Sequence, residues 1–195
     1  MSPGSPARRW EDVTMESLRG HLLLAGPALW DPNFRRAVIL IGQHDEDGAV
    51  GVVLNRVADV TVAEAAPPLA PIVDDGDALF LGGPVEPASA VVVADFAEPE
   101  RAQILALGTI GFLPPEVPED TLGTLRRARV FAGYAGWGPG QLEVEMSEEG
   151  SWIVEPATPT DIFTDDPGGL WSAVLKRKGR AFDVLRFMPV DPSSN

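Results

Sequence analysis

Short apolar runs separated by turn-forming residues dominate the chain, and this pattern predicts strands more often than helices. Residues 21–25 form the first such run. Two further runs, residues 38–43 and 49–54, flank Asp47-Gly48. An Asp-Gly pair between apolar segments is a strong hairpin signal, because the turn requires positive φ at its centre. The pattern therefore predicts a strand followed by a β-hairpin in the first third of the chain.

Helix signals are shorter than strand signals. Thr61 and Glu64 have the spacing of a capping box, and Pro67 and Pro68 must end any helix that begins there. We also predict helices at residues 121–127, 161–164 and 169–178, the last of them amphipathic. Apolar runs predict further strands at residues 79–81, 90–94, 129–134 and 152–155, with a last apolar segment at 182–187. Since residues 90–94 are almost all apolar, we expect that strand to be buried on both faces.

The strand at residues 129–134 runs into the glycine-rich sequence GWGPGQLEVEMSEEG. Pro139 suits the first turn of a helix, where its missing N–H costs nothing, and Gly150 would stop that helix. Strands and helices alternate without a strict rhythm, so we predict an α+β (layered α/β) fold: a mixed sheet with hairpins and crossover helices. The expected organisation is a flexible N-terminal tail at 1–18, one domain at 19–190 and a C-terminal tail at 191–195.

Charge narrows the classes of partner. The 195 residues include 29 acidic side chains and 15 Lys or Arg, giving a formal net charge of −14. Such a field repels polyanions, and duplex DNA binding relies on cations that neutralise phosphates, so direct DNA binding is not expected. Two basic clusters could oppose this reading if they met in space: Arg126, Arg127 and Arg129, and Lys176, Arg177, Lys178 and Arg180. The alternative is two unrelated helix ends, where cations are favoured.

Cysteine is absent, which excludes disulfides, thiolate metal sites and cysteine nucleophiles. That composition suits a reducing cytosol, so we expect a cytoplasmic protein. The apolar runs are far shorter than the ~20 residues of a spanning helix, and the N-terminus lacks the apolar core of a secretory signal. No membrane partner is expected.

Several segments together resemble a known family. GHLLLAGPALWDPNFRRAVILI, GAVGVVLNR, LGGPV, FAGYAGWGPGQLEVEM and SWIVEPA occur in that order between about residues 20 and 175. In sequence and spacing they are similar to the YqgE/AlgH family of bacterial proteins. The resemblance implies a mixed α/β fold, and some members carry the label of transcriptional regulator. Family members often have a small hydroxyl residue where this chain has Ala37, and a proline where it has Val57.

The glycine-rich segment is the main candidate for a site. A loop of this kind before a helix exposes N–H groups that bind anions, yet its spacing matches no phosphate motif and the following helix is acidic. Gln141 and Glu145 lie four residues apart and share a helix face. With Tyr134 and Trp137 they could line a polar pocket. The alternative is a structural turn, with Trp137 as a core anchor and Glu145 in a capping role.

Two other strand ends are weaker candidates. Gly82 and Gly83 end one strand, where ligands gather in open α/β sheets, but a sharp turn also requires glycine there. Asn55 ends another, where asparagine more often stabilises a turn. His44 beside Asp45, Glu46 and Asp47 lacks the spacing of a calcium or zinc site, so a solvated hairpin tip is expected and no metal site is predicted.

These observations favour a non-enzymatic binding or regulatory protein that acts through a protein or small-ligand partner, without a cofactor. The tentative ligand-binding residues are Asn55, Gly82, Gly83, Tyr134, Trp137, Gln141 and Glu145. One alternative is a hydrolase that uses Glu145 with a bound metal or nucleotide. A second is a regulator that binds DNA directly, and a third is a purely structural or oligomeric role.

Overall fold

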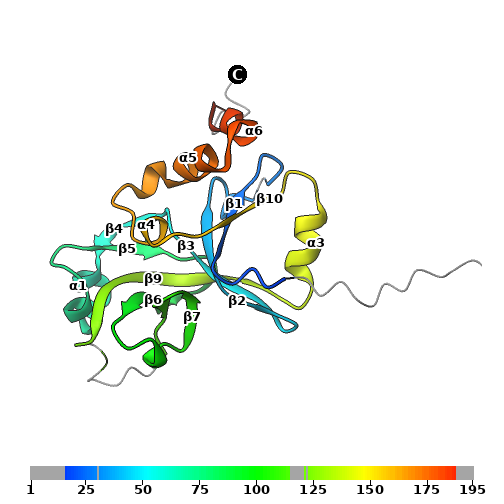
Figure 1. Ribbon diagram of the computed structural model, residues 1–195. Coiled ribbons are helices and arrows are strands. Elements are labelled where there is room, and N and C mark those ends of the chain that lie inside the picture. Colours follow the sequence, from blue (N-terminus) through cyan, green and yellow to red (C-terminus); the bar gives the residue numbers. More distant parts are fainter. Residues whose placement is uncertain (1–15, 30, 115–120, 122, 188–195) are drawn as a thin grey trace, which may run out of the picture.

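A computed structural model describes residues 16–29, 31–114, 121 and 123–187 (Figure 1). The strands are β1 His21–Ala25, β2 Val38–Asp45, β3 Gly48–Val53, β4 Val57–Thr61, β5 Ala78–Leu81, β6 Val85–Phe96, β7 Ile104–Leu107, β8 Ile110–Phe112, β9 Leu125–Trp137 and β10 Trp152–Pro156. The α-helices are α1 Val62–Ala65, α3 Gln141–Ser147, α4 Pro159–Ile162, α5 Pro167–Lys178 and α6 Arg180–Asp183. Three 3-10 helices, η1 Pro67–Ile72, η2 Pro99–Arg101 and η3 Val184–Phe187, complete the elements of the described residues.

The strands join into one sheet in the order β10-β1-β2-β3-β9-β6-β8-β7. Most neighbours are antiparallel, whereas β5 runs parallel to β9 and pairs with β4 on its other side. The α+β prediction with a mixed sheet is confirmed. So is the hairpin of β2 and β3, in which Asp45 pairs with Gly48 and Gly48 has a φ of +123°.

The long strand β9 links the two halves of the sheet. It pairs with β3 near its C-terminal end and with β6 along most of its length. Gly133, with a φ of +67°, interrupts its alternation, so that Phe131 and Tyr134 pack in the same apolar cluster. A Cβ at residue 133 would lie 2.7 Å from the carbonyl oxygens of both Gly83 and Val85. Only glycine satisfies both the backbone conformation and this close approach.

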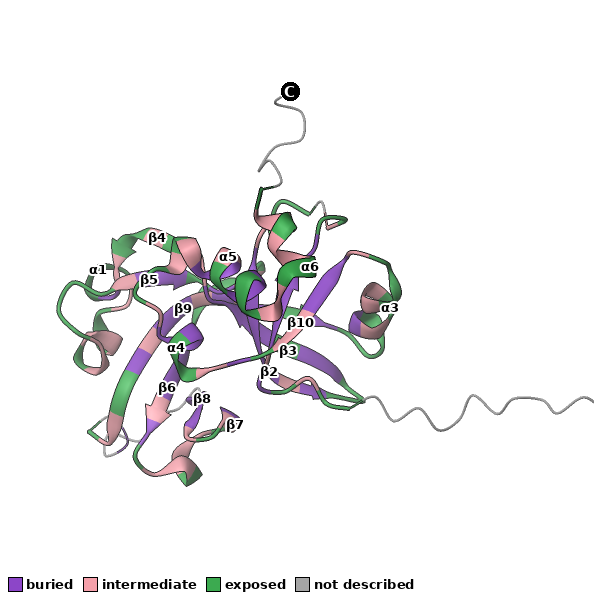
Figure 2. Cartoon of the chain, turned by 45° about the horizontal axis from the view of Figure 1, so that its top comes forward, coloured by how far each residue is buried: buried purple, intermediate pink, exposed green. Residues whose placement is uncertain are grey.

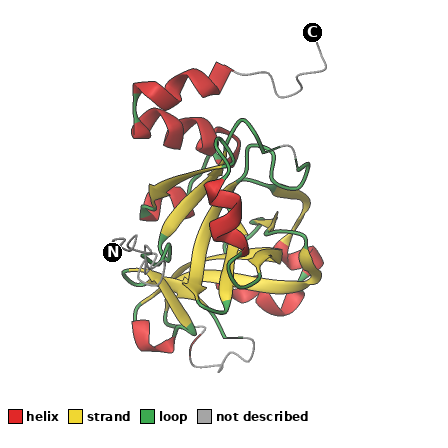
Figure 3. Cartoon of the chain, turned by 90° about the vertical axis from the view of Figure 1, so that its right-hand side faces the viewer, coloured by secondary structure: helices red, strands yellow, loops and turns green. Residues whose placement is uncertain are grey.

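Three apolar clusters fill the spaces between the sheet and its helices, which lie on the outside (Figure 3). The largest cluster lies beneath α5, where the predicted amphipathic residues Leu170, Val174 and Leu175 are buried. The second packs Leu142 of α3 against β1, β2 and β3, and the third includes Val62 of α1. Buried residues therefore concentrate in the central strands (Figure 2).

Two helix predictions need correction. Residues 125–127 of the predicted helix 121–127 belong to β9 instead, because Leu125 and Arg127 pair with Phe96 and Asp95 of β6. Pairing along the sheet outweighs a weak local helix preference. The predicted helix at 161–164 begins earlier, at Pro159, since Thr158 and Asp161 form a capping box.

The other corrections concern the ends of elements. Pro139 precedes α3 and is not in its first turn, because Gly140 is the N-cap, with a φ of +71°. β6 is longer than predicted and is not buried throughout: Val92, Val93 and Ala94 are buried, but Ala90 is exposed. Residues 1–15 and 191–195 of the expected tails lie outside the described residues.

Candidate functional site

Trp137, Gln141 and Glu145 come together as the sequence suggested, and a fourth residue joins them. One carboxylate oxygen of Glu145 accepts hydrogen bonds from the indole Nε1 of Trp137 and of Trp152, each at 2.9 Å. The other accepts from Nε2 of Gln141 at 3.0 Å. Trp152 lies on β10 and has no sequence pattern that ties it to this helix, so sequence reasoning missed it.

The two tryptophans form an aromatic cluster with Phe34. Ring centroids lie 6.2 Å apart for Phe34 and Trp137, 5.8 Å for Phe34 and Trp152, and 6.0 Å for Trp137 and Trp152. Both indoles are buried, so each N–H needs an acceptor, and Glu145 supplies it for both. This carboxylate therefore fastens α3 to β9 and β10.

The glycine-rich loop also bonds internally. The N–H of Gly138 donates to Oε1 of Gln141 at 3.1 Å, and the acidic Glu143 occupies the first turn of α3. The Gly138 N–H therefore already has an acceptor, and the charge of Glu143 opposes an anion at this end of the helix. The described geometry favours the structural reading of this loop.

Tyr134 does not join the other three candidates. It belongs to the cluster beneath α5, whereas Ala135 and Trp137 belong to the cluster beneath α3. Successive strand residues face opposite sides of a sheet, so Tyr134 and Trp137, three positions apart, point away from each other. The structure therefore does not bring Tyr134 into a shared pocket with Gln141 and Glu145, which the sequence had left as one of two possibilities.

The remaining candidates lie at strand ends, where they make backbone contacts. Asn55 accepts from the Val38 N–H at 2.9 Å and donates to the Arg36 carbonyl at 2.8 Å, which holds the segment before β2. Gly82 donates to the Ala132 carbonyl and accepts from the Val53 N–H, each at 2.8 Å. Gly83 packs against the Tyr134 backbone, which a Cβ would approach to 2.2 Å. Ligand binding by these residues stays a prediction.

The sequence predicts that His44 belongs to a solvated hairpin tip. The structure corrects this, because His44 is buried. Its Nδ1 accepts from the Leu18 N–H at 3.0 Å, and its Nε2 lies 2.7 Å from a carboxylate oxygen of Glu143. Since Nδ1 is an acceptor, the proton of the neutral ring is on Nε2 and points at Glu143. No sequence signal links these residues, which lie 99 positions apart.

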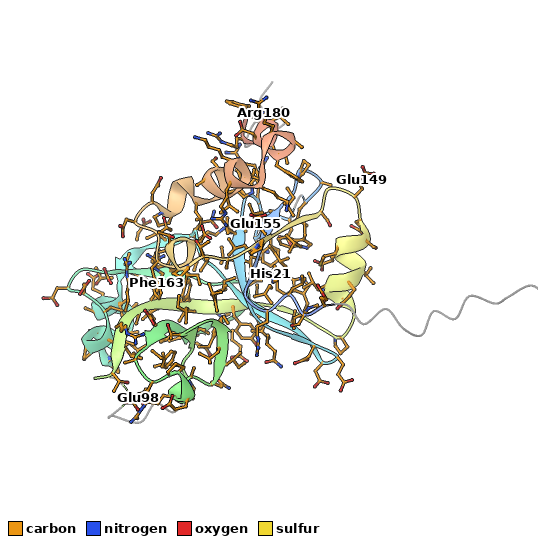
Figure 4. The ribbon with its side chains drawn as sticks, in the orientation of Figure 1. His21, Glu98, Glu149, Glu155, Phe163 and Arg180 are labelled. Carbon is orange, nitrogen blue, oxygen red and sulfur yellow. The ribbon has the colours of Figure 1, made fainter. Side chains whose placement is uncertain are left out.

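The two basic clusters lie apart, and most of their cations have partners within the chain. Arg127 packs over the ring of Phe163, whereas Arg180 lies at the outer end of the helical segment (Figure 4). Arg126 pairs with Asp95 at 2.9 Å, and Arg177 pairs with Asp161 at 2.8 Å.

Arg129 is the most buried member of these clusters. It donates to the carbonyls of Ile162 and Thr164, each at 2.8 Å, and burial, with the nearby charge of Arg127, lowers its pKa to about 10. It still carries its charge at neutral pH, but its donors point at backbone oxygens of its own chain.

Tyr134 lines a groove on the other side of the sheet from Trp137. Its volume is about 470 Å³, in the range of small-ligand sites. Six strands contribute to its walls, with Gly42, Val50, Ala90, Ile104, Phe112 and Tyr134. We call it the β6 groove, because residues 86 and 89–92 of β6 form one side.

Polar groups are few in the β6 groove and lie beside an apolar wall. Gln43, Gln103 and Ser89 supply neutral donors and acceptors, and Glu86 is the single charged residue of the described lining. Glu86 has a φ of +46°, an uncommon conformation for a residue with a side chain. An apolar cavity with a few placed polar groups can bind an apolar partner and fix its orientation.

Side chains that bind metals do not gather in the described part of the chain. Within it, no group of three or more His, Asp or Glu side chains is placed to hold a metal ion. Nor does any described helix have the length and apolar character needed to cross a bilayer.

Comparison with known proteins gives the family. Residues 22–183 match the model of a family described as AlgH-like. The chain is 44% identical over 191 residues to a UPF0301 protein of Streptomyces coelicolor, covering 93% of this chain and 97% of the relative. It is 39% identical over 194 residues to a UPF0301 protein of Thermobifida fusca, covering 92% and 96%.

Solved structures agree with this assignment. A crystal structure of a Corynebacterium diphtheriae protein superposes with a TM-score of 0.76 at 30% identity, covering 96% of this chain and 95% of that one. The solution structure of AlgH from Pseudomonas aeruginosa gives a TM-score of 0.68 at 29% identity, covering 97% and 98%. The resemblance seen in the sequence is confirmed, and the chain belongs to the AlgH-like, or UPF0301, family.

Proposed function

We propose that this protein is a non-enzymatic binding protein whose site is the β6 groove. The observation that carries the proposal is the groove itself, an apolar cavity of about 470 Å³ to which six strands contribute. A site built on strands is held more rigidly than one built on loops, which favours binding with little reorganisation. The partner supplies apolar groups that fill the space between Val50, Phe112 and Tyr134.

The hydrogen bonds that Glu145 accepts favour a binding role for the protein over a hydrolase that uses this carboxylate. Its two oxygens receive three hydrogen bonds from Trp137, Trp152 and Gln141. A general base needs a free oxygen within hydrogen-bond reach of the proton it removes. We therefore assign Glu145 a structural role, and assign recognition to residues on the opposite face of β9.

The test uses Tyr134 as a reporter. It is the only tyrosine of the chain, so 3-fluorotyrosine incorporation gives a single fluorine resonance inside the groove. A library of apolar and amphipathic small-molecule fragments is titrated into the labelled protein. We expect saturable shifts of this resonance with a subset of fragments.

Two variants serve as test and control. Ala90→Trp fills the groove and should abolish the shifts, while Val144→Trp, at a residue 64% exposed on α3, should leave them unchanged. If no fragment shifts the resonance, or if both variants respond alike, the groove is not the binding site.

A further inference from the structure

A small hollow lies beside the end of β5, apart from the β6 groove. Its volume is about 180 Å³, and no described residue lines both cavities. Apolar residues form most of its described lining: Val53, Leu81, Pro84, Pro87 and Ala132. Neither proline has an amide proton, so polar contacts must come from elsewhere in the lining. We call this cavity the Arg56 hollow, after its charged residue.

The size of the Arg56 hollow limits what it can hold. Sites for drug-sized molecules usually have volumes of about 300 to about 1,000 Å³. A cavity of about 180 Å³ suits a smaller group. Leu81 at its wall is 46% exposed, which is high for a large apolar side chain. An aliphatic group that covers Leu81 removes apolar surface from water, and this favours binding.

Charge distinguishes this hollow from the rest of the molecule. Arg56 is the single charged residue of its described lining, although the whole chain has a net charge of −14. In the β6 groove, by contrast, the charged residue of the described lining is Glu86. A cation in a partly enclosed site attracts an anion more strongly than one in open solvent, because water screens it less. The described lining therefore favours a small anion.

One nitrogen of Arg56 holds its guanidinium in place. Nη2 donates to the carbonyl oxygens of Pro32 at 3.1 Å and of Arg35 at 3.3 Å. Pro32 directly precedes Asn33, which also lines the hollow, so this contact keeps the guanidinium beside that wall. Nε and Nη1 carry three further N–H groups, which bond to no residue in the described part of the chain. The exposed amide of Asn33 adds a neutral donor, so both oxygens of a carboxylate can find partners here.

One acidic side chain opposes an anion at this place. Burial lowers the pKa of Arg56, and the charge of Asp31 acts in the other direction. Asp31 is not in the described lining, and its Oδ1 accepts the Asn33 N–H at 2.8 Å. Arg56 stays charged at neutral pH, because a guanidinium is not deprotonated in proteins. Asp31 therefore reduces the attraction of Arg56 for an anion without removing its charge.

We propose that the Arg56 hollow binds a carboxylate that carries a short, branched aliphatic group. The carboxylate accepts hydrogen bonds from Arg56 and Asn33, and the aliphatic group covers Leu81 and Pro87. A free small acid and the C-terminal residue of a protein chain both present this chemistry. The hollow is a second site, and its role does not depend on the β6 groove.

Isovalerate is the probe for this site. It is titrated at constant ionic strength into the ¹⁵N-labelled full chain, while the amide resonances of Leu81 and Gly83 are followed by two-dimensional NMR. We expect saturable shifts. Isovaleramide has the same shape without the charge, and inorganic phosphate has the charge without the aliphatic group. Each should bind at least about tenfold more weakly than isovalerate.

Leu81→Glu tests the wall without altering Arg56. The new carboxylate lies beside the guanidinium and competes with the probe, so isovalerate binding should weaken at least about tenfold. Val144→Glu makes a matched change at a residue of α3 that is 64% exposed. It should leave the dissociation constant of isovalerate unchanged.

Asp31→Asn tests the opposing charge. The asparagine keeps an oxygen for the Asn33 N–H but removes the negative charge near Arg56, so isovalerate binding should tighten by about two- to fivefold. Asp45→Asn is the control, because Asp45 is exposed and also accepts a backbone N–H two residues further on, from Asp47. It should not change the affinity.

The peptide acetyl-Gly-Ala-Leu and its C-terminal amide identify the source of the carboxylate. Binding of the acid at least about tenfold tighter than isovalerate assigns the site to a protein C-terminus. Equal or weaker binding assigns it to a free small acid. The amide should not bind in either case.

Four results would overturn the inference. One is the absence of saturable shifts up to about 50 mM isovalerate. Another is binding of isovaleramide or phosphate as tight as that of isovalerate. The third is unchanged affinity in Leu81→Glu, and the fourth is equal affinity in Asp31→Asn and Asp45→Asn. The proposed function of the β6 groove would stand in each case, because fragment binding at Tyr134 is measured separately.

Discussion

Single residues in this protein have roles that their chemical type alone does not reveal. Glu145 looks like a candidate base on an acidic helix, yet its carboxylate is the shared acceptor of two buried indoles. The pairing with Gln141 follows from the i, i+4 spacing and could be predicted. The contact with Trp152 could not, because it depends on how β10 lies beside the end of α3.

Replacing Glu145 by glutamine tests this structural role. The new amide has one oxygen, and its NH₂ group must face either the indole donors or the Gln141 donor. We expect Glu145→Gln to lower the free energy of unfolding by about 1–3 kcal/mol, as for a buried donor left unpaired. Urea unfolding followed by tryptophan fluorescence measures it.

The matched control is Glu148→Gln, one residue beyond the helix, where the side chain is exposed. It should change stability by less than about 0.5 kcal/mol. Equal stability of both variants and the unmodified protein would show that the indole bonds contribute nothing.

Glu143 makes stability dependent on pH. Its pKa is lowered, first because the carboxylate accepts a backbone N–H of its own residue and then because His44 donates to it, while burial opposes the change. A carboxyl group whose folded pKa lies below its unfolded value stabilises the fold above the unfolded value. That contribution is lost as the pH falls through the folded pKa.

We therefore expect the free energy of unfolding to decrease on acidification below about pH 4, in part through Glu143. Urea midpoints at pH 7 and at about pH 3 measure the change. Glu143→Gln should show a smaller decrease than the unmodified protein, and an equal decrease would contradict the assignment.

At the scale of elements, glycine and proline mark the ends and bends that pairing then fixes. The hairpin of β2 and β3 follows from Asp47-Gly48, and α1 ends before Pro67 as expected. By contrast, the bend of β9 at Gly133 has no local signal that separates it from an ordinary loop. It becomes necessary only because β5 and β6 pass beside it.

Gly133→Ala should be strongly destabilising, because the new methyl group meets two carbonyl oxygens at 2.7 Å in addition to the cost of positive φ. We expect a loss of more than about 2 kcal/mol, or failure to accumulate soluble protein. Thermal unfolding by circular dichroism measures it.

Gly76→Ala is the control for the free-energy cost of placing a side chain at a positive φ. Gly76 has a φ of +86°, and a Cβ there would meet nothing within 4 Å. It should cost only about 1 kcal/mol, the conformational part alone. Equal losses at both positions would mean that close packing at Gly133 adds nothing.

At the scale of the whole molecule, the net charge and the pairing of the cations both disfavour binding to DNA. Arg126, Arg127 and Arg177 each form an ion pair within the chain, and Arg129 bonds to carbonyls. A protein that binds DNA must bring unpaired cations to phosphates. Our expectation that this chain does not bind DNA directly rests on this arrangement and on the charge of −14.

A gel shift with duplex DNA tests this expectation at two salt concentrations. We expect no retardation at about 50 mM or about 200 mM salt, because phosphate binding would have to overcome an acidic field. Retention that weakens between the two concentrations would contradict it and would favour the regulator alternative.

The sequence by itself determined the features that depend on neighbours along the chain. These include the family resemblance, the acidic charge, the β2–β3 hairpin, the capping box at Thr61 and the face shared by Gln141 and Glu145. Each follows from local backbone preference or from helical spacing, which act over a few residues.

Only the tertiary structure decided where the candidate site lies. The β6 groove takes wall residues from six strands, and five of them come from β6 alone. The burial of His44 and the separation of Tyr134 from Trp137 have the same origin. They depend on strand register and on which face each residue presents, and long-range pairing sets both.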